Sequence, residues 1–305
     1  MPRNSRLISR QGKPRKVAKR LAVTLFFVLF CFVWFFPILY IVNGSLKSSL
    51  DWATNPRSFF PDFGYTLDNF KILFVGGDQG GIYDYGLDAQ PITAWILNSL
   101  FASLAHTFLY LAFAILAAYV FVFLDFKGKN ALFSLLLLSM AVPSVMLTTP
   151  QFENILRLGL SLNVWSLILP GLGGISGVYL LRQFFRGIPK ALIESAKIDG
   201  AGHAKILWKV VLPLAKSALF VQGLFSFMSV WNDYAWAQIV LGYGDKGLWT
   251  LQLGLTYLVD VNKGQLGSTG VTLAASLVSM LPVFIVYLFA EKNIVEGVAF
   301  TGMKN

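Results

Sequence analysis

Cysteine and charge are both scarce in this sequence. A single cysteine, Cys31, occurs among 305 residues, which excludes an intrachain disulfide framework and a cysteine-rich metal site. Charged residues make up 13% of the chain, about half the usual share of a soluble domain. The two histidines, His106 and His203, are far apart in the sequence and form no cluster. We therefore expect neither a metal site nor a cofactor.

A nucleotide-binding loop is also missing. No G-x-x-x-x-G-K-[ST] motif occurs anywhere, and the glycine-rich stretch GGDQGG at 76–81 lacks the lysine and the Ser or Thr that close such a loop. The stretch GLGGISG at 171–177 lies in an apolar run, and its Gly173 and Gly177 suit close helix packing instead. We therefore expect no nucleotide hydrolysis and no catalytic residue in this chain.

Long apolar runs are abundant. Hydrophobic residues make up 56% of the chain, and runs of about 20 such residues are long enough to cross a bilayer. Because backbone groups must be bonded internally in lipid, and because these runs do not alternate as barrel strands do, the spans must be helices. We predict an all-α polytopic membrane protein with six transmembrane helices, at about 21–42, 96–122, 131–149, 164–183, 217–240 and 270–290.

Basic residues show the orientation of these spans. The net charge of +10 would suggest nucleic-acid binding in a soluble chain, but here 19 of the 25 Lys and Arg fall in segments on one side of the predicted topology. That side is the cytoplasm, so we expect both termini there and no nucleic-acid partner. The predicted order is a basic tail 1–20, a retained first helix 21–42, an extracytoplasmic loop 43–95, a core 96–290 and a cytoplasmic tail 291–305.

The cytoplasmic loop 184–213 has more apolar surface than a linker needs. Pro189 suits the start of a short helix, and Gly200 permits a left-handed turn at its end. Small residues at Ala191, Ser195 and Ala196 would let this helix sit close to another protein. From composition alone, an amphipathic loop whose lysines meet anionic lipid is an equally good interpretation.

The spacing in this loop resembles the EAA motif of binding-protein-dependent ABC importer permeases. That motif reads Glu-Ala-Ala, three residues, Gly, nine residues, then Ile-x-Leu-Pro. This sequence departs from it at two positions, because Ser195 replaces an alanine and Val210 an isoleucine. The matching residues are Glu194, Ser195, Ala196, Gly200, Val210, Leu212 and Pro213.

The resemblance covers roughly residues 20–300. Over this length the sequence is similar to the smaller permease of the maltose type, in the carbohydrate branch. It rests on the motifs Asn98-Ser99-Leu100, Leu158-Gly159-Leu160, Leu180–Phe185 with Ile188-Pro189, Trp231-Asn232-Asp233-Tyr234 and Val295-Glu296-Gly297. It implies the type I ABC importer permease fold and a place in the cell membrane.

An assembly follows from the resemblance. It implies a second homologous permease, two ATPase subunits and an external solute-binding protein that delivers a carbohydrate, most simply an oligosaccharide. The runner-up solute is not a sugar, and a self-contained secondary transporter is the alternative class. The loop would dock the ATPase and couple it to the bilayer-embedded pathway through Glu194, Ser195, Ala196, Asp199, Gly200, Ala201, Leu212 and Pro213.

Two groups inside the spans each have two interpretations. An acid at membrane depth, Asp233, is by default a functional hypothesis, and with Trp231, Asn232 and Tyr234 it would suit a sugar pathway or gate. The alternative is a structural carboxylate bonded to another helix. His106 is either a hydrogen-bonding residue between helices or part of a proton relay.

Overall fold

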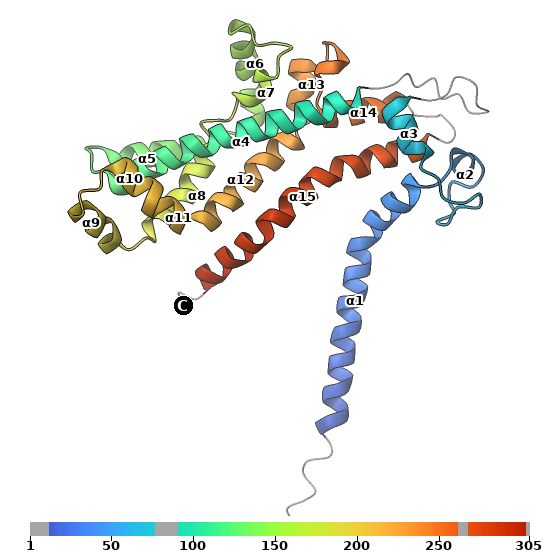
Figure 1. Ribbon diagram of the computed structural model, residues 1–305, viewed down its shortest axis with the longest axis horizontal. Coiled ribbons are helices and arrows are strands. Elements are labelled where there is room, and N and C mark those ends of the chain that lie inside the picture. The colour runs from blue at the N-terminus through green and yellow to red at the C-terminus, as the bar shows by residue number, and fades with distance from the viewer. Residues whose placement is uncertain (1–11, 77–90, 262–267, 303–305) are drawn as a thin grey trace, which may run out of the picture. The chain divides into compact units, whose positions relative to one another are not determined.

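The computed structural model describes residues 12–76, 91–261 and 268–302. Within these ranges the chain is mostly helical (Figure 1), and its only β contact is an isolated bridge between Lys47 and Tyr65. The chain divides into two compact units. Unit 1 comprises residues 1–73, 77–87 and 264–277, and unit 2 comprises 74–76, 88–263 and 278–305.

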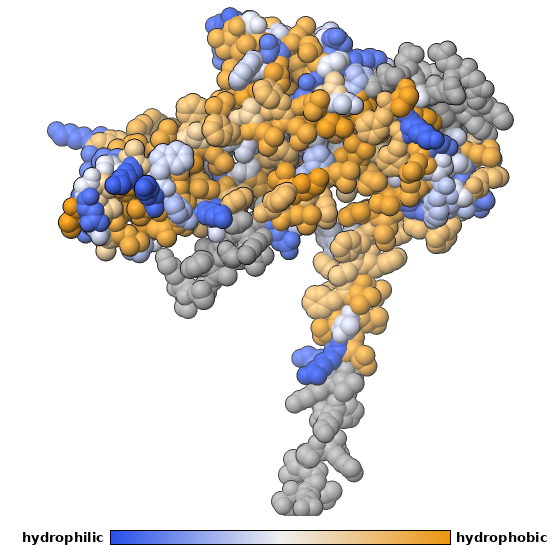
Figure 2. Space-filling view, in the orientation of Figure 1, coloured by the Kyte–Doolittle hydropathy of each residue, from blue (hydrophilic) through white to orange (hydrophobic). Residues whose placement is uncertain are grey.

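Unit 1 begins with a long apolar helix, α1 (Gly12–Ser45), which starts inside the segment expected to be a tail. Its apolar side chains face outward: Leu25, Phe30 and Phe35 are 61%, 50% and 60% exposed. Figure 2 shows apolar residues along most of this helix and hydrophilic ones toward its N-terminal end. Such a surface is stable in lipid or against another chain, which agrees with a retained first span.

The rest of unit 1 folds around a buried acid in the segment after α1. Asp51 lies on α2 (Ser49–Thr54), and its carboxylate accepts hydrogen bonds from the Ser48 hydroxyl at 2.6 Å and from the amides of Asp62 and Phe63 at 2.6 and 3.2 Å. Burial raises the pKa of this carboxyl, but these hydrogen bonds and the Lys47 charge outweigh it, so the pKa lies below its usual value. The segment expected to be an extracytoplasmic loop therefore begins as a folded cap, continued by α3 (Asp68–Val75). The glycine-rich part from residue 77 on lies outside the described residues.

Unit 2 is built on α4 (Ile92–Phe123), against which α8 (Ile175–Arg186) and α12 (Lys216–Trp231) both pack (Figure 1). Tyr110 of α4 joins the three helices. Its hydroxyl accepts hydrogen bonds from the Gly177 amide at 2.9 Å and from Gln222 Nε2 at 3.1 Å. A Cβ at Gly177 would lie 2.6 Å from this hydroxyl, so the close approach requires glycine there.

Three of the expected spans are continuous helices. The stretches Lys19–Ser45, Ile92–Phe123 and Thr269–Phe289 are each long and apolar enough to cross a membrane. They match the expectations at 21–42, 96–122 and 270–290 closely. The last one belongs to α15 (Thr269–Gly302), which continues as a helix through most of the segment expected to be the C-terminal tail.

The other three expected spans, at 131–149, 164–183 and 217–240, are interrupted, so none of them is a single continuous helix. In the first, α5 (Lys129–Ser139) ends before Pro143, and a 3-10 turn (Ser144–Leu147) leads into α6 (Thr148–Arg157) at a bend of 92°. Proline cannot donate the next helical hydrogen bond, and it disfavours the helical conformation of the residue before it. A hydropathy average over about 20 residues does not detect such a break.

The second interrupted span breaks at Pro170 and Gly171. A single turn, α7 (Trp165–Ile168), precedes them, and α8 begins only at Ile175. Gly171 has a φ of +81°, a left-handed conformation that favours glycine. The third breaks after Trp231, and α13 (Ala235–Leu241) follows a short turn.

The remaining helices of unit 2 are short. A 3-10 turn (Lys246–Leu248) and α14 (Leu251–Val261) follow α13. Taken together, the described residues contain three helices able to cross a membrane, or five if each bent pair forms one span. The second bent pair joins His203–Leu214 to α12 at 82°.

Candidate functional site

The loop between α8 and α12 folds into two short helical pieces. α8 ends at Arg186, and the next helix is α9 (Lys190–Ile198). The sequence predicts that this helix starts at Pro189, whereas in the structure Pro189 is the residue just before it. A second piece follows as α10 (His203–Ile206), a π turn (Leu207–Val211) and α11 (Leu212–Leu214). Figure 2 shows hydrophilic residues gathered at the end of unit 2 that holds α9 and α10.

The end of α9 explains the alanine and glycine positions of the motif. Gly200 has a φ of +72°, and its amide donates to the Lys197 carbonyl at 3.0 Å, while the Ala201 amide donates to the Ala196 carbonyl at 2.9 Å. These two bonds form a Schellman cap, which needs a residue in the left-handed conformation. Ala196 and Ala201 are both partly buried against the core of unit 2, so their small size lets α9 lie close to its own chain.

The π turn explains the proline at the end of the motif. Pro213 has no amide hydrogen, and its ring would collide with the carbonyl four residues earlier in a regular helix. The wider turn at Leu207–Val211 comes just before it, and the Leu212 amide donates to the Leu207 carbonyl, five residues back. Leu212 itself packs against the core, while Pro213 is exposed.

The helix α9 is seated firmly on unit 2. Ile193 is 5% exposed and belongs to the same buried cluster as Leu181 and Phe185 of α8. A hydrogen bond of 2.9 Å between the Tyr119 hydroxyl of α4 and His203 Nδ1 holds the second piece of the loop. A force on α9 would therefore reach α4 and α8 through packed side chains.

The outward face of α9 is free within this chain. Glu194, Ser195, Asp199 and Gly200 are exposed, and a Cβ at Gly200 would meet no atom within 4 Å. Ile198 is 86% exposed, an unusual position for an apolar side chain next to lysines. Leu192 adds a second apolar side chain at 45% exposure. Trp208, 70% exposed on the π turn, is a further candidate that no sequence pattern singled out.

The second predicted site, Trp231 to Tyr234, is the turn between α12 and α13. Trp231 is 1% exposed, its ring stacks on Phe227 at 5.7 Å, and its Nε1 donates to the Ser279 carbonyl at 3.2 Å. Asp233 Oδ1 accepts the Trp236 amide at 3.0 Å and so caps the first turn of α13. Two members of the predicted site thus have structural contacts inside the chain, while Asn232 and Tyr234 are exposed.

His106 lies between helices of unit 2. It is 6% exposed, and its Nδ1 donates to the Ile168 carbonyl at 2.7 Å. The ring also stacks on Tyr110 with the two centroids 5.8 Å apart. These contacts match the interpretation of His106 as a hydrogen-bonding residue between helices.

Comparison with known proteins identifies the family. Residues 110–294 match the model of the binding-protein-dependent transport system inner membrane component. The chain is 30% identical to the arabinooligosaccharides transport system permease protein AraQ of Bacillus subtilis over 298 residues, covering 95% of this chain and 98% of that one. It is also 30% identical over 212 residues to the sn-glycerol-3-phosphate transport system permease protein UgpE of Yersinia pestis, covering 70% and 74% of the two chains.

The fold has a counterpart of known structure. A chain of a bacterial ABC transporter involved in the import of the acidic polysaccharide alginate superposes with a TM-score of 0.74 at 25% identity, covering 96% of this chain and 99% of that one. The family match spans the loop of α9, the turn after Trp231 and most of α15. The chain belongs to the family of binding-protein-dependent transport system inner membrane components, and it is a permease subunit of an ABC importer, not an enzyme.

Proposed function

We propose that this chain pairs with a second, homologous permease to form the membrane pathway of a carbohydrate importer. An external binding protein delivers the solute, and two separate ATPase subunits supply the energy. The family to which the chain belongs is named for its dependence on a binding protein, and the chain has no nucleotide-binding loop of its own. The solute is an oligosaccharide, as for AraQ, with which this chain aligns over nearly its whole length.

The observation that supports coupling is the outward face of α9. A short helix with an isoleucine that is 86% exposed, closed by a tight left-handed cap, suits insertion into a cleft of another protein. The interpretation as a lipid-facing loop explains the lysines but not the exposed Glu194 and Asp199 on the same element. We therefore assign Glu194, Ser195, Asp199, Gly200 and Ile198 to the ATPase contact, with Ala196, Ala201, Leu212 and Pro213 shaping the loop.

Coupling then works as a shift between two states of the permease. ATP closes the ATPase dimer, and the closed dimer holds α9 in a different position from the open one. Because Ile193 and the Tyr119–His203 hydrogen bond tie the loop to α8 and α4, those helices move with it. ATP drives this change only to the extent that it binds one state more tightly than the other.

The proposed topology has six crossings with both termini in the cytoplasm. The three continuous helices and two bent pairs supply five, and α7 with α8 supplies the sixth as a broken span. Non-helical backbone at membrane depth is tolerated where protein or a water-filled cavity covers it. Reporter fusions to both termini test this arrangement, and activity of an extracytoplasmic reporter at either end would contradict it.

The exposed members of the turn after α12 are proposed to line the pathway or its gate. Asn232 offers hydrogen bonds, and Tyr234, 40% exposed, offers a ring face for a sugar. In this assignment Trp231 and Asp233 hold the turn that presents them.

A test of coupling uses two glycines of the same geometry. Gly200 and Gly128 both have a left-handed φ, +72° and +83°, and a Cβ at either would meet no atom within 4 Å. Gly200→Trp and Gly128→Trp therefore carry a similar backbone strain of about 1–2 kcal/mol. In reconstituted membranes, Gly200→Trp should abolish uptake and solute-stimulated ATP hydrolysis together, while Gly128→Trp retains both.

Ile198→Asp gives a second test without backbone strain. The side chain makes almost no contact within its own chain, so insertion should be normal and copurification of the ATPase should fall. Wild-type coupling in both Gly200→Trp and Ile198→Asp would show that α9 is not the coupling element.

The solute is tested with the cognate binding protein. Arabinooligosaccharides and alginate oligosaccharides should bind, and sn-glycerol 3-phosphate should not. The second candidate solute is a glycerol phosphate, because UgpE shares the same identity over a shorter stretch. Tight binding of sn-glycerol 3-phosphate in place of the sugars would overturn the carbohydrate assignment.

A further inference from the structure

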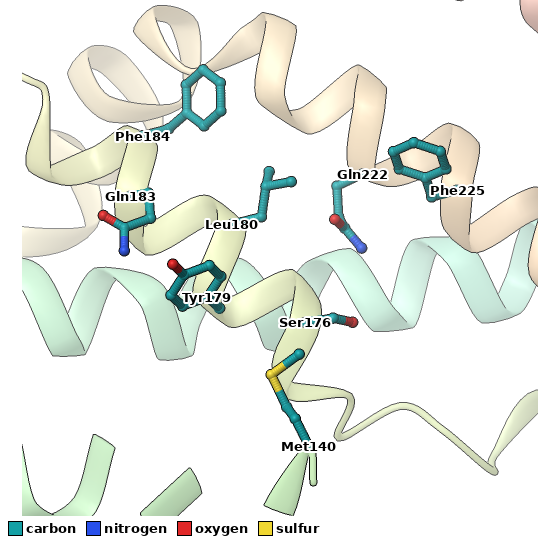
Figure 3. A pocket seen from close by; sticks show the side chains of 8 residues that line it. All are labelled: Met140, Ser176, Tyr179, Leu180, Gln183, Phe184, Gln222 and Phe225. Atoms are coloured by element: carbon teal, nitrogen blue, oxygen red, sulfur yellow. The ribbon is translucent and has the colours of Figure 1, made fainter. Parts of the chain in front are cut away.

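An open groove of about 420 Å³ lies between α8 and α12, with Met140 at one end (Figure 3). Its volume falls in the range of small-molecule pockets, roughly 300–1,000 Å³. Four of its lining residues are polar, and rings from both helices, Phe184 and Phe225, lie beside them. The polar residues are Ser176, Tyr179, Gln183 and Gln222.

The polar residues of α8 form one stripe along the helix. Ser176, Tyr179 and Gln183 follow each other at spacings of three and four residues, which places them on one face. The opposite face, which includes Val178 and Leu181, is buried in the core of unit 2. The sequence of α8 therefore separates a face that packs against its own chain from an open face on which these polar side chains lie beside Leu180 and Phe184.

Lipid is a poor neighbour for such a face. Amide and hydroxyl groups in a membrane helix seek hydrogen-bonding partners, and polar side chains tend to face a bundle interior or a water-filled cavity. A second groove of unit 2 gives the contrast. It is lined by apolar side chains such as Leu104, Leu219 and Phe289, with Thr107 among them, as expected for a lipid or helix contact.

Gln222 is held in place at the floor of the groove. It is 6% exposed, and its Nε2 donates to the Tyr110 hydroxyl at 3.1 Å, the same hydroxyl that accepts the Gly177 amide. Among the described residues, none donates a hydrogen bond to its Oε1. A positioned amide with an acceptor still available is the kind of polar group that fixes the orientation of a ligand in a pocket.

We infer that this groove is a solute-contact site of this subunit and takes a short part of the passing oligosaccharide. One sugar unit bonds to Gln222 and stacks its C–H face on Phe225, which is 60% exposed, and a neighbouring unit bonds to Tyr179 and Gln183 on the other side of Leu180 (Figure 3). This assignment rests on the proposed carbohydrate import and adds that this permease, and not only its partner, touches the solute. The contacts are few and the groove is open, so the bound sugar can leave again.

Thiol labelling tests whether the groove is wet and whether solute covers it. In a Cys31→Ser background, Gln183→Cys should react with a charged, water-soluble maleimide in the reconstituted complex. Leu116→Cys, at a 55% exposed apolar position of α4, should not react. An arabinooligosaccharide or alginate oligosaccharide that the wild type imports, added with its binding protein and ATP, should slow labelling at position 183. Absent labelling, or labelling that solute does not slow, would overturn the assignment.

Transport gives the second readout. Gln183→Leu removes one hydrogen bond to the solute and should lower the maximal uptake rate about two- to tenfold. Gln151→Leu, a partly buried glutamine of α6 outside the groove, should not. If the wild type imports carbohydrate and both variants match it, the groove assignment fails alone. If the wild type imports no carbohydrate, the proposed function fails with it.

Discussion

The loop around α9 and the turn after Trp231 both match the same family in sequence, but several motif residues of the loop are exposed, whereas two motif residues of the turn are bonded within the chain. In the loop, Glu194, Asp199 and Ile198 point away from the chain. In the turn, Trp231 and Asp233 are engaged by Ser279 and Trp236 of their own chain. A motif can therefore mark a contact with a partner or a joint between helices, and the sequence pattern alone does not distinguish them.

The physical basis of the difference is burial. Trp231 is 1% exposed and Ile198 is 86% exposed. Removing the first changes the folded chain, whereas removing the second changes what the chain can bind. Mutations at the two regions should therefore separate stability from coupling.

The largest effect is expected for Trp231→Ala. The change removes a buried ring, its stacking on Phe227 and the hydrogen bond to Ser279, and such truncations typically cost about 3–5 kcal/mol. Thermal unfolding in detergent should show a lower midpoint and a smaller yield of folded complex. Ile198→Ala is the matched control and should unfold like the wild type. Equal stability of the two variants would contradict the contrast between the buried turn at Trp231 and the exposed face of α9.

A smaller effect is expected at Asp233, where two variants separate charge from capping. Asp233→Ala removes the acceptor for the Trp236 amide and should cost about 1 kcal/mol, the usual value for a lost helix cap. Asp233→Asn keeps an oxygen at that position, so stability and transport should stay near wild type. Loss of uptake in Asp233→Asn, with normal stability, would instead show that the carboxylate itself serves the pathway.

The smallest effect is expected for Tyr119→Phe. The ring stays packed in the core, and only the hydrogen bond to His203 is lost, at a cost of at most about 1 kcal/mol. Solute-stimulated ATP hydrolysis should fall modestly while the unfolding midpoint changes little. Hydrogen exchange of residues 203–206 should rise, and unchanged exchange would mean that this bond does not hold the loop.

Much of the fold could be predicted from the sequence because long apolar runs have few alternatives in a membrane. The helices at 21–42, 96–122 and 270–290 were located by length and hydropathy alone, and α9 was located by Pro189 and Gly200. The breaks at residues 140–143 and 169–174 lie at Pro143 and Pro170, where the sequence predicts that a helix kinks or ends, but Pro37 and Pro282 lie within continuous helices, so proline alone does not show which of the two occurs. Whether they end a helix depends on contacts such as that of Tyr110 with Gly177, which join residues 67 positions apart.

The candidate sites were predictable to different extents. The spacing in the loop indicated a left-handed turn at Gly200, and the Schellman cap confirms it. The same spacing places Ala196 at a partner surface, which stays a prediction, and the structure adds that Ala196 is partly buried against its own core. The polar stripe of α8 could not be predicted from mean hydropathy, because an average over the expected span at 164–183 does not show which face of a helix carries the polar residues.

The exposure of α1 has a consequence for how the chain can vary. From Leu21 to Phe35 every side chain is exposed, so none of the described residues packs closely enough to require a particular side-chain shape there. Stability of the chain itself then depends on the apolar character and length of that stretch, and not on the order of its residues. A library that shuffles residues 21–35 should largely retain folding, while shuffling an equal length of α4, with its buried Trp95, Ser103 and Tyr110, should not. If natural variants of this chain keep the same residues at the same positions of α1, the cause would therefore be a contact with a partner outside the chain.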